Sequence, residues 1–146
     1  MERKEFIKTC SIGCLGFSAF GLLVQGCAAS KVVNIPISDE GLLIPLSEFE
    51  LVKTDQKRYR SYLIVQNEKL QYPICVYRLT ENDYRALLMR CTHQGTELQV
   101  FGDKLQCPAH GSEFGNKGNV TNGPASENLR TFPVKITNDQ LKILLT

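Results

Sequence analysis

Residues 91–112 read CTHQGTELQVFGDKLQCPAHGS. This stretch contains both histidines of the chain, and each follows a cysteine closely: Cys91 precedes His93, and Cys107 precedes His110. Two thiolates and two imidazoles on a pair of loops are a suitable donor set for a metal centre. The stretch therefore predicts a metal site built from two short loops.

This pattern resembles the iron–sulfur signature of the Rieske family. The similarity continues beyond the quoted stretch through Gly118, the turn at residues 123–125 and Leu129. The resemblance implies an all-β fold, a Rieske-type antiparallel β sandwich or barrel. It also implies a small inserted cluster-binding subdomain at about residues 88–126.

The resemblance further implies one 2Fe–2S cluster per chain. Carried over by position, Cys91 and Cys107 would bind one iron, and His93 and His110 would bind the other. Ser112 stands where high-potential members have a hydroxyl that donates a hydrogen bond to the cluster. Two neutral imidazoles in place of two thiolates reduce the negative charge around the irons, which raises the reduction potential above that of all-cysteine ferredoxins. A structural zinc site with the same four ligands is the alternative, but the spacing is unlike the usual zinc-binding pairs.

Three positions depart from the cytochrome bc-type members of the family. Thr96 and Ala109 occupy the places of two further cysteines that form a disulfide there, so loop rigidity has to come from packing and hydrogen bonds. Phe114 occupies the place of a tyrosine that donates a second hydrogen bond. We therefore expect a potential in the lower or middle part of the family range of about −150 to +300 mV.

From Lys31 onward the chain has the apolar periodicity of short strands. A helical turn is expected only within residues 45–53, with Ser47 as its cap. Residues 111–130, rich in glycine and asparagine, are expected to form a long functional loop. Cys75 lies in an apolar run and is expected to be buried and inert. The expected strands fall at residues 32–37, 42–46, 62–65, 74–77, 84–89, 98–101, 105–107, 132–136 and 141–145.

Residues 1–27 have the features of an export signal: a basic start, an apolar centre and small residues beyond it. The opening RKEFIK is similar to a twin-arginine signal, and the exit LVQGC is similar to a bacterial lipobox with Cys27 as the lipidated residue. The alternative is an uncleaved N-terminal helix, but the apolar centre is short for a bilayer. We expect residues 28–146 to form the Rieske domain, anchored on the periplasmic side of a bacterial membrane.

The near-balanced charge, a net +2, argues against a nucleic-acid partner. No second cofactor motif is present, so we expect an electron-transfer component and not a complete enzyme. Its expected partner is a cytochrome or an oxidoreductase subunit, with a quinol as a candidate donor in a respiratory complex. Two alternatives stay open: the small subunit of a periplasmic molybdenum oxidase, and a structural metal-binding module without a redox role.

Overall fold

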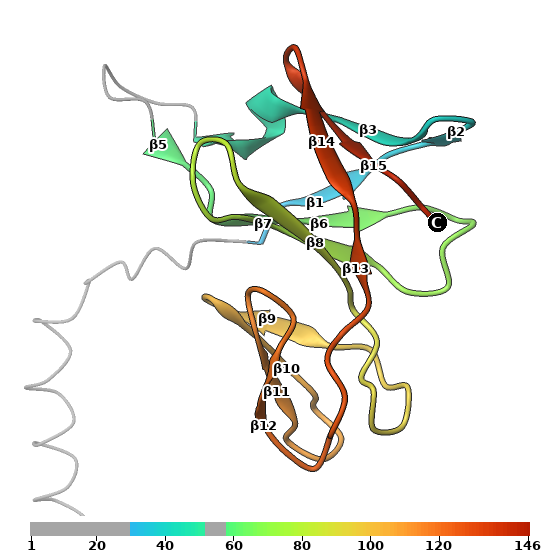
Figure 1. Cartoon of the computed structure of the whole chain (residues 1–146), viewed down its shortest axis with the longest axis vertical. Coiled ribbons are helices and arrows are strands. Elements are labelled where there is room, and N and C mark those ends of the chain that lie inside the picture. The colour runs from blue at the N-terminus through green and yellow to red at the C-terminus, as the bar shows by residue number, and fades with distance from the viewer. Residues whose placement is uncertain (1–29, 52–57) are drawn as a thin grey trace, which may run out of the picture.

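The computed structural model of the protein describes residues 30–51 and 58–146. Regular structure in this part is almost entirely β-strand, which confirms the all-β prediction. Figure 1 shows a larger part, which we call the base, above a smaller four-stranded sheet. The predicted export signal and Cys27 lie outside the described residues. No helix in residues 30–51 or 58–146 is long and apolar enough to cross a membrane.

The main sheet of the base has five strands, and its centre is an antiparallel meander. Its edge strand β1 runs parallel to β6, although the sequence predicted antiparallel pairing throughout. Two parallel strands cannot be joined by a tight turn, and a long segment of the chain therefore separates β1 from β6. The strand order is β1 (Val32–Asn34), β6 (Tyr62–Gln66), β7 (Ile74–Arg78), β8 (Tyr84–Leu88) and β13 (Thr131–Phe132).

A second sheet covers one face of the main sheet (Figure 1), and a core of buried aliphatic and aromatic side chains belongs to the two sheets together. At its side, β4 (Glu50–Leu51) pairs with β5 (Arg58–Tyr59). The order of the second sheet is β14 (Val134–Thr137), β15 (Gln140–Ile143), β3 (Gly41–Pro45) and β2 (Ile37–Ser38).

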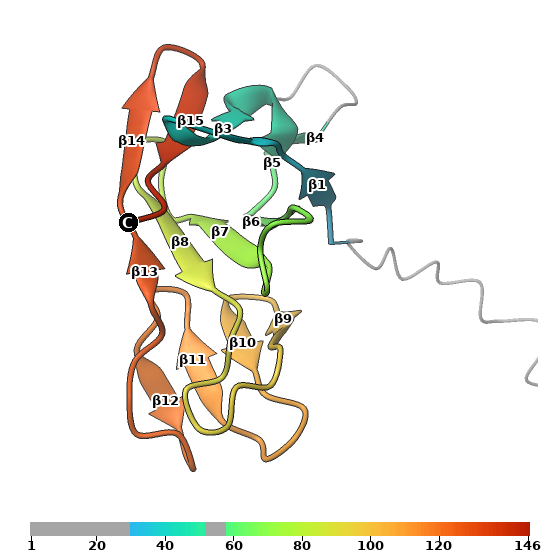
Figure 2. The ribbon, with the colours of Figure 1, turned by 90° about the vertical axis from the view of Figure 1, so that its right-hand side faces the viewer.

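The small sheet is inserted in the chain between β8 and β13 and lies below the base (Figure 2). A second core cluster joins it to the base: Leu105 and Phe114 from the small sheet pack with Cys75, Tyr77 and other base residues. Strand β7 is therefore buried on both faces, which explains its continuous apolar run. The order of the small sheet is β12 (Val120–Asn122), β11 (Glu113–Gly115), β10 (Lys104–Gln106) and β9 (Gln99–Phe101).

Two local predictions were wrong. A helical turn is present where it was expected, as the 3-10 helix η1 (Leu46–Phe49), but the predicted cap was wrong. Ser47 lies inside the helix and makes no capping bond, and Pro45 occupies the cap position. Residues 111–130 are not one loop, because they contain β11 and β12. Both strands are short and offer few apolar side chains, so they lack the alternation that reveals longer strands.

Candidate metal centre

Two loops of the same construction hold the predicted ligands: the first loop, residues 91–96, and the second loop, residues 107–112. In the first loop the Cys91 N–H donates to the Thr96 carbonyl, and the Gly95 N–H donates to the Cys91 carbonyl, each at 2.8 Å. The second loop repeats both bonds at the same relative positions, at 2.8 and 3.0 Å. In each loop the glycine has a φ of +78°, a conformation that favours glycine. Each loop is thus a closed turn with the cysteine at its start.

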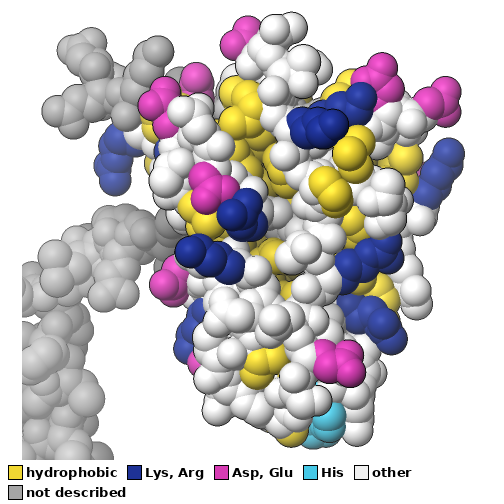
Figure 3. Space-filling view, in the orientation of Figure 1, with side chains coloured by type: hydrophobic (Ala, Val, Ile, Leu, Met, Phe, Trp, Pro, Cys, Tyr) yellow, Lys and Arg dark blue, Asp and Glu magenta, His cyan; other side chains and the backbone are white. Residues whose placement is uncertain are grey.

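The four predicted ligands separate into an inner and an outer pair. Cys91 and Cys107 are buried, and their side chains interact with each other. His93 and His110 are exposed, and their ring centroids lie 5.0 Å apart with the planes at 87°. Figure 3 shows histidine side chains at the far end of the small part of the molecule. Within the described ranges, no three cysteine, histidine or acidic side chains converge on one point that could hold a single ion.

This arrangement fits a two-iron cluster by the chemistry of its donors. Each iron would need only two protein ligands, and the structure offers two sulfurs inside and two imidazoles outside. Burial acts to raise the pKa of the Cys107 thiol, but the His110 and Ala109 N–H groups and the side chains of Cys91 and Thr96 outweigh it, so the pKa lies below its usual value. The second loop therefore stabilises the thiolate, the form that binds metal.

A third loop, residues 123–128, braces the two cysteine–histidine loops. The Ala125 N–H donates to the Ser112 Oγ at 3.0 Å, and the Thr92 Oγ1 donates to the Glu127 carbonyl at 2.7 Å. All three cysteines in the described part of the chain are free. Hydrogen bonds thus hold these loops together without a disulfide among the described cysteines. The contact between Thr92 and Glu127 was not predicted from the sequence, because neither residue type signals a long-range contact.

Ser112 is fully buried, and its hydroxyl oxygen accepts the Ala125 N–H. Its own hydrogen remains available to donate, as the predicted bond to the cluster requires. We expect Ser112→Ala to lower the free energy of unfolding by about 1–3 kcal/mol, because a buried N–H loses its acceptor. The same variant is expected to lower the reduction potential. Urea unfolding and voltammetry check the two effects, and an unchanged potential would contradict the donor role of Ser112.

Cys75 is fully buried, as predicted. Burial is the main cause that raises the pKa of its thiol well above the usual range. Burial likewise raises the pKa of Tyr77, whose hydroxyl lies against that thiol. Both groups therefore stay neutral in the folded protein, and Cys75 is an inert part of the second core.

A neutral buried thiol makes stability depend on pH. In the unfolded chain Cys75 would ionise near its ordinary pKa of about 8.5, but in the folded chain it stays protonated. Below about pH 8.5 the Cys75 thiol therefore does not reduce the free energy of unfolding. Above that pH its ionisation in the unfolded chain lowers the free energy of unfolding by up to about 1.4 kcal/mol per pH unit. We expect urea unfolding between pH 8 and pH 10 to show this loss in the wild type and a smaller loss in Cys75→Ala. Equal slopes would contradict the assignment.

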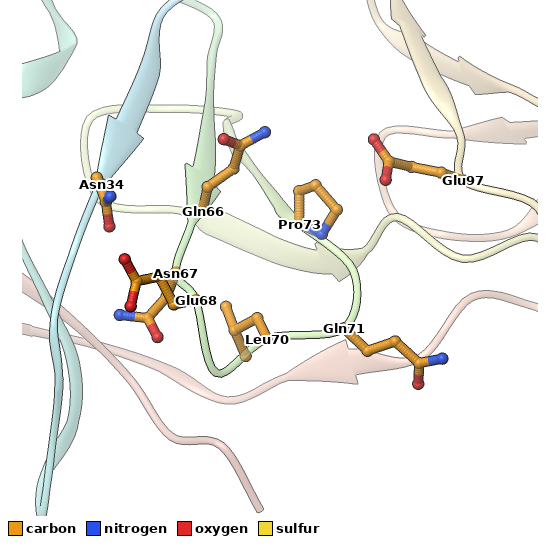
Figure 4. Close-up of a pocket in the computed structure, with 8 residues that line it drawn as sticks. All are labelled: Asn34, Gln66, Asn67, Glu68, Leu70, Gln71, Pro73 and Glu97. Atoms are coloured by element: carbon orange, nitrogen blue, oxygen red, sulfur yellow. The ribbon is translucent and has the colours of Figure 1, made fainter.

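A hollow of about 320 Å³ is lined by residues of the base and by Glu97, and neither histidine lines it. Figure 4 shows that its polar side chains do not converge: Gln71 points away from the group formed by Asn34, Asn67 and Glu68. Asn67 already bonds the Ile35 carbonyl and the Lys69 N–H, each at 2.8 Å. We assign this hollow no part in the metal centre.

Comparison with known proteins shows which family this chain resembles. Residues 48–133 match the family model of the Rieske [2Fe-2S] domain. The cytochrome b6-f complex iron-sulfur subunit of Prochlorococcus marinus is 26% identical over 98% of this chain and 84% of its own length. The oxygenase component of chloroacetanilide N-alkylformylase from Rhizorhabdus wittichii is 32% identical over 49% of this chain, which spans only 23% of that relative.

A solved structure shares the fold. The crystal structure of the cyanobacterial plasma membrane Rieske protein PetC3 from Synechocystis PCC 6803 has a TM-score of 0.51 and 26% identity, over 57% of this chain and 86% of that one. The matched residues of the family model include both cysteine–histidine loops. The chain therefore belongs to the Rieske family, and that membership implies a 2Fe–2S cluster.

Proposed function

We propose that this protein transfers single electrons through a 2Fe–2S cluster. Cys91 and Cys107 would hold the inner iron, and His93 and His110 would hold the outer iron. The observation that carries the proposal is the pairing of two buried, interacting thiols with two exposed imidazoles whose centroids lie 5.0 Å apart. When bound, the cluster supplies a site that takes up and releases one electron.

The residues of the chain orient this site. The closed turns of the two loops fix the cysteines, and the N–H groups of the second loop favour the thiolate form of Cys107. The exposed rings of His93 and His110 would present their outer nitrogens to a partner. Burial of the Cys91 and Cys107 sulfurs excludes water from the side of the cluster site on which they lie.

The proposed potential lies in the lower or middle part of the family range of about −150 to +300 mV. Phe114, fully buried in β11, has no hydroxyl, so only Ser112 remains of the two donors found in high-potential members. Fewer hydrogen bonds to the cluster stabilise the reduced state less. Protein-film voltammetry at pH 7 measures the midpoint, and a value near the top of the range would contradict this reasoning.

The setting we propose is a membrane tether outside the cytoplasm, through a lipidated Cys27 or an N-terminal helix. The names of two relatives support it: one is a subunit of the cytochrome b6-f complex, and another is a plasma membrane Rieske protein. The electron partner would then be a cytochrome or oxidoreductase subunit, with a quinol as donor. Cell fractionation of the wild type and Cys27→Ala tests the tether: release of the variant alone supports lipidation, and retention of both supports the helix.

The decisive experiment is low-temperature EPR of the purified full chain after reduction with dithionite. A rhombic signal with two irons per chain supports the proposal. A colourless protein that contains zinc would support the structural module instead. A molybdopterin enzyme encoded beside the gene would favour the molybdenum oxidase alternative, and a neighbouring cytochrome b would favour quinol chemistry.

A further inference from the structure

A second hollow, of about 370 Å³, lies at the junction between the base and the small sheet. Leu70, Leu88, Phe132 and Leu145 supply apolar side chains to its lining. Two arginines line it as well, and they lie on the two connections between these parts: Arg90 follows β8, and Arg130 precedes β13. In Figure 3, basic side chains with hydrophobic atoms between them follow the right-hand edge of the molecule.

Both guanidinium groups are held beside aromatic rings. The Arg90 Cζ lies 5.8 Å from the centroid of the Tyr72 ring, and the Arg130 Cζ lies 4.9 Å from that of Phe132. Such stacking restricts the side chains and leaves their N–H groups free to bind.

No side-chain carboxylate of the described residues forms an ion pair with either arginine. The ion pairs found within residues 30–51 and 58–146 join other residues, and neither arginine takes part in them. Arg130 does donate from Nη2 to the main-chain oxygen of Thr146, at 2.6 Å. That bond uses one of the five N–H donors of Arg130, and the remaining donors of the two guanidinium groups are available to a ligand.

We propose that this hollow binds a small amphiphilic anion, a carboxylate on an aryl or short acyl body. Its volume falls in the range of small-molecule sites, which combine apolar walls with a few fixed polar groups. Arginine matches a carboxylate with two parallel hydrogen bonds, and the leucines and Phe132 would cover the apolar body. A neutral ligand would bury the guanidinium groups without a counter-charge, which costs free energy. An anion that engages both arginines would tie together the two connections to the small sheet. This site does not depend on the proposed electron transfer.

Isothermal titration calorimetry of the full chain in a non-ionic detergent, with 4-phenylbutyrate as the probe, tests the proposal. We expect saturable binding with one site per chain and no binding of the uncharged 4-phenylbutanamide. Arg90→Gln and Arg130→Gln are each expected to weaken binding about tenfold or more, because each removes a charge-assisted contact. Arg85→Gln is the matched control, since Arg85 also lies on the surface but pairs with Asp83 at 2.9 Å; its affinity should equal that of the wild type.

Three results would overturn the proposal: no saturable heat at millimolar probe, equal binding of the amide, or wild-type affinity in both glutamine variants. Thermal melting by circular dichroism checks that the variants fold. Should a glutamine variant fail to fold, Arg90→Lys and Arg130→Lys replace it, because lysine keeps the charge but cannot form the paired bonds. Lysine variants that bind as tightly as the wild type would then overturn the assignment to a carboxylate. The EPR signal does not enter this test, so its failure is distinguishable from failure of the proposed function.

Discussion

Replacement of His93 by alanine is expected to abolish the rhombic EPR signal of the reduced protein. The imidazole would be one of only two protein ligands to the outer iron, and the chain has no third histidine to replace it. The ring is exposed, so its removal leaves no cavity in either core. Loss of the cluster should therefore occur with the β-sheet spectrum retained. EPR, iron analysis and circular dichroism on the same preparation measure these outcomes.

Two control variants separate ligation from general damage. Gln94→Ala alters the exposed neighbour of His93 and should keep the full signal. Cys75→Ala removes the one described cysteine that is not a predicted ligand, and it should also keep the cluster. A rhombic signal of normal intensity in His93→Ala would show that this imidazole does not bind iron, and the ligand assignment would be wrong.

Phe114→Ala is expected to lower the free energy of unfolding by about 3–5 kcal/mol, the usual cost of removing a buried phenyl ring. Phe114 is fully buried and belongs to the cluster that joins the small sheet to the base. In the sheet it lies opposite Leu105 on one side and Val120 on the other. Its loss should therefore loosen the sheet that carries the second loop, and equilibrium unfolding in urea measures the effect.

Phe101→Ala is the matched control, because Phe101 lies in β9 of the same sheet but is 51% exposed. A loss within about 0.5 kcal/mol is expected there, as for most surface substitutions. Similar losses for the two variants would mean that Phe114 does not support the junction. The comparison thus tests burial and not the aromatic residue type.

Hydrogen bonds from the third loop explain how the two cysteine–histidine loops are held together without a disulfide. The third loop contacts the first through Thr92 and the second through Ser112, with bonds of 2.7 and 3.0 Å. A single segment thus ties both cysteine–histidine loops, which is what a disulfide between them would do. Cys91 and Cys107 are then both free, as the proposed ligand role requires.

The order of residues along the chain was enough to predict the two cysteine–histidine loops and most of the strands. The spacing of Cys91, His93, Cys107 and His110 identifies two short loops, because each pair lies within one turn. The strands of the base were predictable because β7 and its neighbours bury side chains, and burial requires apolar runs. The role of Cys75 was predictable for the same reason.

The contacts between segments far apart in the sequence could be identified only from the three-dimensional structure. The parallel pairing of β1 with β6, the brace from Glu127 to Thr92, and the approach of Arg90 and Arg130 to one hollow join residues far apart in sequence. The short strands β11 and β12 are stabilised by their neighbours in the sheet and not by a local pattern. Local sequence determines which side chains can be buried and which can bind metal. Packing of the whole chain determines which of them come into contact, because that depends on all the segments together.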